Sequence, residues 1–427
     1  MATQSDDVSP LSTRFRGMLS PLNLPDFRRL ITSNFLWWGT RFMELTIVGW
    51  LVLELTNSPW LVAVIGFYRS APFIFAGFVS GPIIDRLGRR RTIVWAQGVN
   101  VLVSSSIALL IWFDWLAYWH LAVGSIILGT SWALDWPARR ALMPDLVGKG
   151  RTVDALLLEN IGQNLSRIIG PFAGGTLIAA VSPAGAYSVL AGAAGLSFLL
   201  LLRLSNDPVP RRHQPGRISA WQDTLAGLRY IRQSQPILGT LLITVVMNFL
   251  AFPYMTVMPV FARDVLGQGP VGLGILGASS GLGAFLGFLV INRLHRRISH
   301  GWIFVVGSCF QCLMLLSFAL SQSFPLSLTL LMLSGIGQAC FGIMQSSIIL
   351  LTASDEMRSR AMGILVLAIG AGPLGTLQIG ALAENYGAPV TLGFETMLSA
   401  LLTVLIAFWL PGLTRRPEDD SPMPAPA

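Results

Sequence analysis

The stretch from Gly81 to Arg91 reads GPIIDRLGRRR and lies between two apolar segments of the chain. Its central part, IDRLGRR at residues 84–90, recurs as INRLHRR at residues 291–297, a shift of 207 residues. The dipeptide Gly170-Pro171 recurs as Gly372-Pro373 with a shift of 202 residues. These two nearly equal shifts indicate an internal repeat that divides the 427 residues into two halves.

The composition is that of a membrane protein. The chain is 53% hydrophobic and 12% charged, with a mean hydropathy of +0.64, whereas soluble domains carry about a quarter charged residues. A helix needs about 20 mostly apolar residues to cross a bilayer. The sequence therefore predicts an all-α membrane protein with twelve transmembrane helices. They are expected at residues 30–55, 58–82, 92–113, 119–138, 154–180, 186–204, 237–262, 270–291, 301–322, 326–352, 361–383 and 388–411.

The basic residues are distributed unevenly along this pattern. If the N-terminus is cytoplasmic, 25 of the 29 Lys and Arg residues fall in cytoplasmic segments and only Arg263 falls in an outside loop. The other three, Arg41, Arg69 and Arg167, lie within predicted helices. The positive-inside rule then predicts that both termini are cytoplasmic and that the two six-helix halves are parallel. These arginines would contact anionic membrane lipids, and we expect no nucleic-acid partner.

The expected organisation follows from these spans. A cytoplasmic N-terminal segment covers residues 1–29, and the N-terminal six-helix half covers residues 30–204. A proline-containing cytoplasmic linker with an interfacial helix covers residues 205–236, and the second six-helix half covers residues 237–412. Residues 413–427, rich in Pro, Asp and Glu, are predicted to be a disordered cytoplasmic tail.

Motifs for enzyme, metal or cofactor chemistry are not found in the sequence. The only lysine, Lys149, lies in VGKG, which lacks the Ser or Thr that a phosphate-binding loop requires. The three cysteines lie in apolar stretches, the sequence contains no HExxH, and no GxSxG elbow presents a serine nucleophile, because GASSG at 277–281 falls inside a predicted span. We therefore expect a protein that is not an enzyme and that uses no metal or cofactor.

Residues 81–91 resemble the signature loop of the major facilitator superfamily, GxxxDRxGRR[RK], at the same place between spans two and three. DWPARRALMPDLV at 135–147 and NLSRIIGP at 164–171 resemble a bacterial exporter branch, the drug:proton antiporters with macrolide efflux proteins and the enterobactin exporter. The resemblance extends from about residue 26 to residue 412. It implies a multi-pass secondary transporter of the bacterial inner membrane that works as a monomer, with protons and a small-molecule substrate as partners.

The resemblance also implies a cytoplasmic gate. Gly81 would allow span two to approach span eleven, and Asp85 would face the start of span eleven, where the helix dipole favours an anion. Arg139 would be the cationic partner of Asp85, although Arg89 and Arg90 are explained equally well as topology signals. The small residues of span five resemble an antiporter motif, and ordinary close packing explains them too. The gate residues are Gly81, Asp85, Arg86, Gly88, Arg89, Arg90 and Arg139, and those of the antiporter motif are Gly170, Pro171 and Gly174.

Charges inside the membrane are costly, about 2.5–3.5 kcal/mol each on insertion scales, so they indicate a partner or a function. They are concentrated in the first half, which we expect to carry proton coupling. Glu44 and Arg69 are each 12.5 residues from the midpoint of the first helical hairpin, about 19 Å below its tip, so we predict that they pair. Glu44 is then either the proton carrier or part of a static pair. The coupling residues are predicted to be Glu44, Arg41, Arg69, Asp135 and Arg167.

The superfamily lines its substrate cavity with spans one, four, seven and ten. Met and aromatic side chains there would give an adaptable apolar surface for hydrophobic or amphipathic compounds. The alternative substrate is an anionic metabolite or siderophore, because Arg41, Arg69 and Arg167 against Glu44 leave a net charge of +2. A non-transporting receptor or scaffold is the remaining alternative. The predicted substrate-binding residues are Asn34, Trp38, Ser131, Met247, Asn248, Phe252, Tyr254, Gln338, Phe341 and Gln345.

Overall fold

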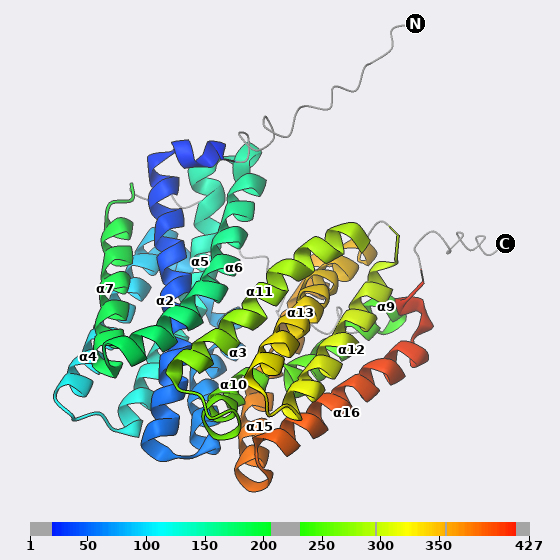
Figure 1. The fold of residues 1–427 in the computed structure, drawn as a ribbon. Coiled ribbons are helices and arrows are strands. Elements are labelled where there is room, and N and C mark those ends of the chain that lie inside the picture. Colours follow the sequence, from blue (N-terminus) through cyan, green and yellow to red (C-terminus); the bar gives the residue numbers. More distant parts are fainter. Residues whose placement is uncertain (1–18, 206–230, 295–296, 355–356, 416–427) are drawn as a thin grey trace, which may run out of the picture.

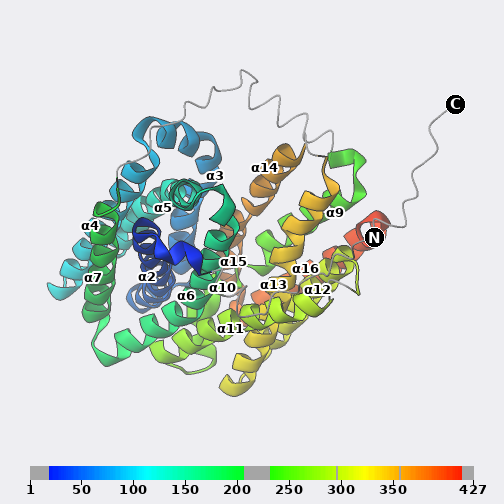
Figure 2. The same cartoon turned by 90° about the horizontal axis from the view of Figure 1, so that it is seen from above.

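The computed structural model describes residues 19–205, 231–294, 297–354 and 357–415, and every regular element in these ranges is a helix. The helices form two bundles that lie side by side (Figures 1 and 2). The first bundle consists of α2 (Pro25–Thr56), α3 (Pro59–Leu87), α4 (Arg89–Trp112), α5 (Tyr118–Val147), α6 (Thr152–Ala180) and α7 (Pro183–Leu202), with the short turns η1 (Ser20–Asn23) and η2 (Lys149–Arg151).

The second bundle has less regular helices. The consecutive elements α9 (Gln235–Val246), η3 (Met247–Ala251), α10 (Tyr254–Val260) and η4 (Phe261–Val265) coincide with the predicted seventh span. The elements η3 and η4 are π-helical turns. The rest of the bundle consists of α11 (Pro270–Leu294), α12 (His300–Ala319), α13 (Phe324–Thr352), α14 (Arg358–Ile369), α15 (Gly372–Tyr386), α16 (Ala388–Trp409) and the turn η5 (Pro411–Leu413).

Each of the twelve predicted spans coincides with a helix or with a run of consecutive helices. In the described ranges, eight helical segments are long and apolar enough to cross a membrane. The helices α2, α3, α5 and α6 are not among the eight, and these four carry the buried charges of the first bundle described below. The predicted interfacial helix of the linker, the tail beyond Arg415 and the N-terminal segment before Leu19 lie outside the described residues.

Local sequence signals set the helix ends. Proline occupies the first turn of α2, α3 and α7, where its missing N–H has no helical partner to lose. The hydroxyl of Ser58 caps α3 by accepting a hydrogen bond from the Leu61 backbone N–H at 3.2 Å. Between α3 and α4 the chain turns at Gly88 with a φ of 85°, a backbone conformation that residues other than glycine rarely adopt.

The repeated Gly-Pro dipeptide has different structures in the two bundles. Pro171 lies inside the continuous helix α6, whereas Pro373 follows a break at Gly370 that separates α14 from α15. Pro171 removes a helical hydrogen bond inside α6, whereas Pro373 lies in the first turn of α15, where its missing N–H has no helical partner to lose.

Close backbone contacts join the two bundles along α6 and α11. A Cβ atom on Gly175 would lie 2.2 Å from the Pro270 carbonyl oxygen, and one on Gly274 would lie 2.6 Å from the Pro171 carbonyl oxygen. Farther along, the Cβ position of Gly281 is 3.0 Å from the Arg167 carbonyl oxygen. Glycine therefore permits this helix contact, as small residues do in other membrane proteins.

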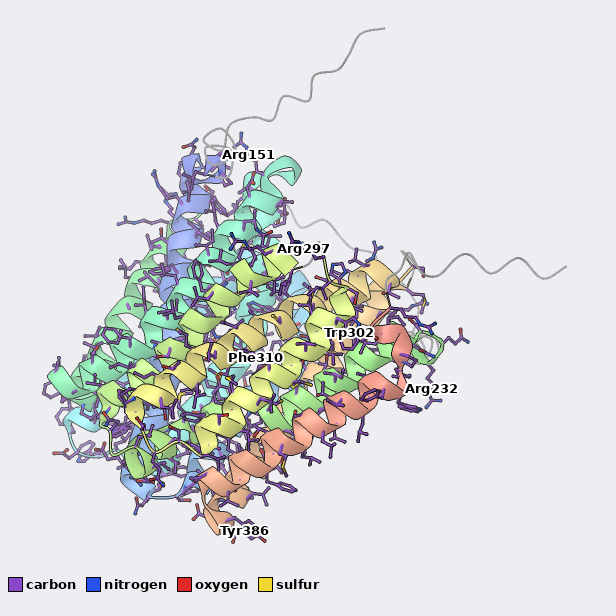
Figure 3. All side chains as sticks on the ribbon, turned by 45° about the vertical axis from the view of Figure 1, so that its right-hand side comes forward. Arg151, Arg232, Arg297, Trp302, Phe310 and Tyr386 are labelled. Carbon is purple, nitrogen blue, oxygen red and sulfur yellow. The ribbon has the colours of Figure 1, made fainter. Side chains whose placement is uncertain are left out.

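The hydrogen bonds described between the bundles lie at one end of the molecule. Arg263 Nη1 donates to the Leu53 carbonyl oxygen at 3.0 Å. Glu384 Oε2 accepts hydrogen bonds from Ser58 Oγ at 2.8 Å and from the Trp60 backbone N–H at 3.0 Å. We call this the latch end. The other end, where η1 and η5 lie, is the terminal end; Figure 3 shows Arg151 and Arg297 there and Tyr386 at the latch end.

Candidate functional site

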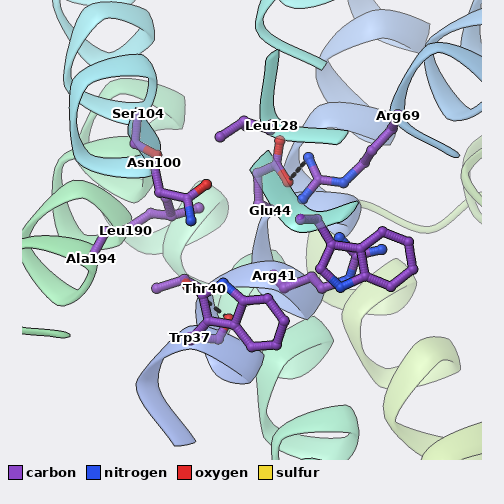
Figure 4. Close-up of a pocket in the computed structure, with 11 residues that line it drawn as sticks. Trp37, Thr40, Arg41, Glu44, Arg69, Asn100, Ser104, Leu128, Leu190 and Ala194 are labelled. Atoms are coloured by element: carbon purple, nitrogen blue, oxygen red, sulfur yellow. Dashed lines mark hydrogen bonds and ion pairs between the residues drawn. The ribbon is translucent and has the colours of Figure 1, made fainter. Parts of the chain in front are cut away.

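Glu44 of α2 and Arg69 of α3 form an ion pair between Glu44 Oε2 and Arg69 Nη1 (Figure 4). Both residues are buried, with 3% and 7% of their surfaces exposed. The hairpin geometry predicted this pairing, and the structure confirms it. A role of Glu44 in carrying protons stays a prediction.

Arg41 has a different partner. It lies one turn before Glu44 on α2, and its guanidinium carbon is 3.8 Å from the centre of the Trp132 ring on α5. A guanidinium group over an aromatic face gains a favourable cation–π interaction. Arg41 is therefore held against α5, and no ion pair of its side chain is described.

A small polar pocket lies beside the ion pair (Figure 4). Its volume is about 30 Å³, and Thr40, Asn100 and Ser104 line it together with Arg41, Glu44 and Arg69. This volume and these polar groups suit one or two water molecules. The pocket therefore offers polar surroundings to the Glu44 carboxylate from inside the first bundle.

A larger apolar cavity also borders the pair, between the two bundles. Its volume is about 170 Å³, and residues of α2, α3, α6, α10 and α11 line it. Glu44 and Arg69 belong to both the polar pocket and this cavity. The ion pair thus borders both a polar space and an apolar one. The apolar lining includes Phe42, Leu45, Val48, Val62, Ile65, Met255, Met258 and Leu273.

Arg167 of α6 is the third charged residue of this cavity. Its Nε atom is buried without a hydrogen-bond partner, and no ion pair of its side chain is described. The cavity therefore contains two arginines and one acid.

A second charged cluster lies within the first bundle, around Arg139 of α5, which is 1% exposed. Arg139 Nε donates to Asp135 Oδ1 at 2.7 Å, and Nη1 donates to Asn34 Oδ1 at 2.8 Å and to Ser33 Oγ at 3.1 Å. Its Nη2 donates to Gln97 Oε1 at 3.2 Å. The guanidinium group thus connects α2, α4 and α5.

Glu159 of α6 extends this cluster. Its carboxylate accepts hydrogen bonds from Asn34 Nδ2 at 2.6 Å and from Trp38 Nε1 at 3.0 Å. Asp135 Oδ2 is buried without a described partner. With Asp135, Glu159 and Arg139, the cluster holds two acids and one arginine. Glu159, which lies two helical turns before Arg167, is a charged residue of this cluster that was not among the site residues predicted from the sequence.

Residues 16–426 match the family of transmembrane secretion effectors, MFS_3. This chain belongs to that family. It is a secondary transporter of the major facilitator superfamily and not an enzyme, as the sequence predicted.

Two groups of curated relatives are similar to this transporter. The multidrug efflux pump Tap of Mycobacterium tuberculosis is 28% identical over 384 residues, which cover 85% of this chain and 88% of the relative. The enterobactin exporter EntS of Salmonella typhimurium is 25% identical over 389 residues, which cover 86% of this chain and 90% of the relative.

Solved structures support the fold. A mutant of the peptide transporter POT has a TM-score of 0.73 at 13% identity, covering 91% of this chain and 95% of that one. A mutant of the nucleoside transporter NupG has a TM-score of 0.71 at 14% identity, covering 91% of this chain and all of that one. The transporter is therefore an all-helical, multi-pass membrane protein with the major facilitator fold.

The gate residues of the transporter are described only in part. Arg89 forms an ion pair with Asp145 and donates to the Ala141 carbonyl oxygen at 2.8 Å. Arg90 donates to the Leu202 carbonyl oxygen at 2.9 Å, and Arg86 is exposed. The side chain of Asp85, and Gly81, lie outside the described residues.

The predicted contact of Asp85 with span eleven therefore stays a prediction, and so does its pairing with Arg139. The described contacts of the Arg139 side chain all lie inside the first bundle, with residues of α2, α4 and α5.

The glycines of the predicted antiporter motif pack against α2. A Cβ atom on Gly170 would lie 2.6 Å from Phe42 Cβ, and one on Gly174 would lie 2.8 Å from the Met43 carbonyl oxygen. Pro171 faces α11, where a Cβ atom on Gly277 would lie 2.8 Å from Pro171 Cβ. The motif therefore joins α6 to α2 and to the second bundle.

None of the ten predicted substrate-binding residues is among those that line the 170 Å³ cavity. Asn34 and Trp38 bind Glu159, and Ser131 donates to the Ala96 carbonyl oxygen at 3.0 Å. Their substrate-binding role stays a prediction.

The seven residues of this set in the second bundle mostly contact that bundle itself. Tyr254 and Gln345 hydrogen-bond to Ser280 and Thr244, at 2.8 and 3.2 Å. Met247 and Phe341 are buried in a hydrophobic cluster against which Phe252 packs. Asn248 donates to the Thr244 carbonyl oxygen at 2.9 Å, and Gln338 Oε1 is buried without a described partner.

Proposed function

We propose that this transporter exports hydrophobic or amphipathic small molecules from the bacterial cytoplasm in exchange for protons, by alternating access. The observation that carries the proposal is the buried Glu44–Arg69 pair, which borders both a polar pocket and an apolar cavity between the bundles. The names of the relatives Tap and EntS, an efflux pump and an exporter, support the outward direction.

The proposed orientation places twelve membrane-spanning segments in the cytoplasmic membrane, in two six-helix halves with both termini in the cytoplasm. The excess of arginine in the segments at the terminal end supports it. The latch end, with Arg263 and Glu384, is then extracellular. In this conformation the halves are joined by hydrogen bonds at the extracellular side, as expected of a state that opens to the cytoplasm.

The coupling step uses the ion pair. An ionised Glu44 holds Arg69 by direct charge attraction, whereas a protonated Glu44 loses most of that attraction. Protonation from the extracellular side would therefore free Arg69 and allow the cavity to change shape and charge. Release of the proton to the cytoplasm, down its gradient, would restore the pair and return the transporter to the substrate-accepting state.

Efflux from cells tests this proposal. An efflux-deficient bacterial strain expressing the transporter should accumulate less of the neutral lipophilic dye Nile red, and an uncoupler should abolish the difference. Glu44→Gln should abolish it as well. Glu54→Gln should not, because Glu54 lies exposed on the same helix without a described ion pair. Efflux that survives both the uncoupler and Glu44→Gln contradicts the proposal.

A second candidate function is export of an anionic metabolite or siderophore. Arg167 favours it, because this arginine borders the cavity without a described ion pair and could bind a carboxylate or catecholate. Fluorescein, a carboxylate dye, is the matching probe. Export of fluorescein that depends on Arg167, without export of Nile red, would favour this second function.

A further inference from the structure

The helix α16 carries a line of buried polar residues that lies outside the site described above. Thr391, Glu395, Ser399 and Thr403 follow one another at intervals of four residues, and each is at most 3% exposed. This spacing places them on one face of the helix. The face meets α12, where Cys312 Sγ donates to Ser399 Oγ at 3.5 Å. The second bundle therefore encloses a polar strip, which we name the α16 strip.

Several atoms of the α16 strip have no hydrogen-bond partner among the described residues. Both carboxylate oxygens of Glu395 are buried without a partner, and so are the hydroxyls of Thr391 and Thr403. On α12, Gln311 is 1% exposed, and its side-chain atoms Oε1 and Nε2 are also buried without a hydrogen-bond partner. Buried polar groups are satisfied in nearly all native structures, so each exception requires an explanation.

Glu395 is the strongest of these exceptions because an ionised carboxylate would place a full charge there. Glu44, in the first bundle, has Arg69 as its counter-ion. No ion pair is described for Glu395, and α16, α9, η3 and η5 carry no other ionisable residue. The titratable residues on the other helices that pack against α16 are His300, Cys309 and Cys312 of α12, Glu384 and Tyr386 of α15, and Tyr254 of α10.

None of these residues is placed to neutralise Glu395. His300 begins α12 at the terminal end, where the next residue, Gly301, contacts Leu413, whereas Glu395 is nearer the latch end of α16. Glu384 is hydrogen-bonded to Ser58 at that end. An isolated buried carboxylate without a counter-ion costs many kcal/mol, and such a group is neutral instead.

We propose that Glu395 is a proton-binding site of the second bundle. It holds a proton in the conformation described here and releases it when water reaches the α16 strip. This inference rests on the proposed proton-coupled function and adds to it a second exchangeable proton, distant in sequence from Glu44. It assigns an ionic role to the half of the molecule in which the sequence predicted none.

Infrared spectroscopy of the purified full-length transporter in a detergent without ester groups tests the assignment. The wild type should show the C=O absorption of a protonated carboxylic acid at neutral pH, and Glu395→Gln should lose it. Glu395→Asp should shift the band, which covers the case in which the glutamine variant does not fold. Glu54→Gln, on an exposed carboxylate, should leave the band unchanged. A band that is identical in wild type, Glu395→Gln and Glu395→Asp overturns the proposal.

A transport measurement on the same preparations separates this inference from the proposed function. Proteoliposomes with wild-type protein should concentrate Nile red when a pH gradient is imposed, and those with Glu395→Gln should do so less. Wild-type transport that ignores the gradient overturns proton coupling, and with it the coupling role of Glu395. A normal gradient response in Glu395→Gln that has lost the infrared band overturns only the coupling role of Glu395.

Discussion

The two bundles share a repeated sequence pattern, yet their buried acidic residues have opposite surroundings. The first bundle places Glu44, Asp135 and Glu159 against arginines or hydrogen-bond donors. The second bundle has only Glu395 as a described buried acid, and it gives this acid no counter-ion. The second bundle is instead the one with π-helical turns and a broken helix. The two halves thus have the same order of helices but differ in their buried charges and in the regularity of their helices.

The largest expected effect concerns the Arg139 cluster. Arg139→Leu removes the only described cation near Asp135 and Glu159, and removal of one partner from a buried charged pair costs about 3–5 kcal/mol. We expect a loss of folded protein, measured by size-exclusion chromatography in detergent and by thermal unfolding. Arg140→Leu is the control, because Arg140 stacks on Trp136 without a described ion pair. Equal stability of both variants would show that the Arg139 ion pair adds no stability to the first bundle, and would contradict the account of its buried charges.

The contact between the bundles should be the next most sensitive region. Gly175→Ala places a methyl group 2.2 Å from the Pro270 carbonyl oxygen, so α6 and α11 must separate, at a cost of about 1–3 kcal/mol. Thermal unfolding should show the loss. Gly192→Ala in α7, where nothing lies within 4 Å of the new Cβ, should leave the unfolding temperature unchanged or raise it. A Gly175→Ala protein as stable as the wild type would contradict the described contact.

A substitution in the predicted gate should affect folding less and transport more. Asp85→Asn should insert normally yet lose most Nile red efflux, because the uncharged side chain interacts less with the positive end of a helix dipole. Labelling of single engineered cysteines at the two ends of the molecule would report the changed balance of states. Unchanged labelling and transport would show that Asp85 has no role in a gate and only contributes to membrane topology.

The smallest effect is expected at the latch end. Glu384→Gln weakens hydrogen bonds to Ser58 and Trp60 that are partly exposed, and partly exposed charged interactions contribute about 0.2–1 kcal/mol. The variant should fold normally and label faster at a cysteine near residue 57. Asp114→Asn, at a loop of the same end within the first bundle, is the control. Unchanged labelling would show that the Glu384 contacts do not hold that end closed.

Helix positions and one ion pair were predictable from the sequence, because both depend on distance along a helix. Glu44 and Arg69 are at equal depth on two sides of one turn, so helix rise alone places them together. The Arg139 cluster combines Ser33, Gln97 and Glu159 from three further helices, and no local pattern fixes how those helices pack.

The predicted substrate residues show a second reason why side-chain positions could not be predicted from the sequence. The π-helical turn from Met247 to Ala251 adds a residue to a turn and rotates the side chains around it, so the positions of this span that face a cavity do not follow a regular α-helical spacing. Met247 accordingly packs in the core of the second bundle, while Met255 borders the cavity.

The most direct test of the central claim is gradient-driven transport by four proteins in proteoliposomes: the wild type, Glu44→Gln, Arg69→Gln and the double variant. Each single substitution leaves a buried charge without its partner and should damage folding. The double variant should recover folding and exchange Nile red across the membrane, yet fail to concentrate it when a pH gradient is imposed. A double variant that concentrates the dye as well as the wild type does would show that the pair is only structural, and would contradict the account.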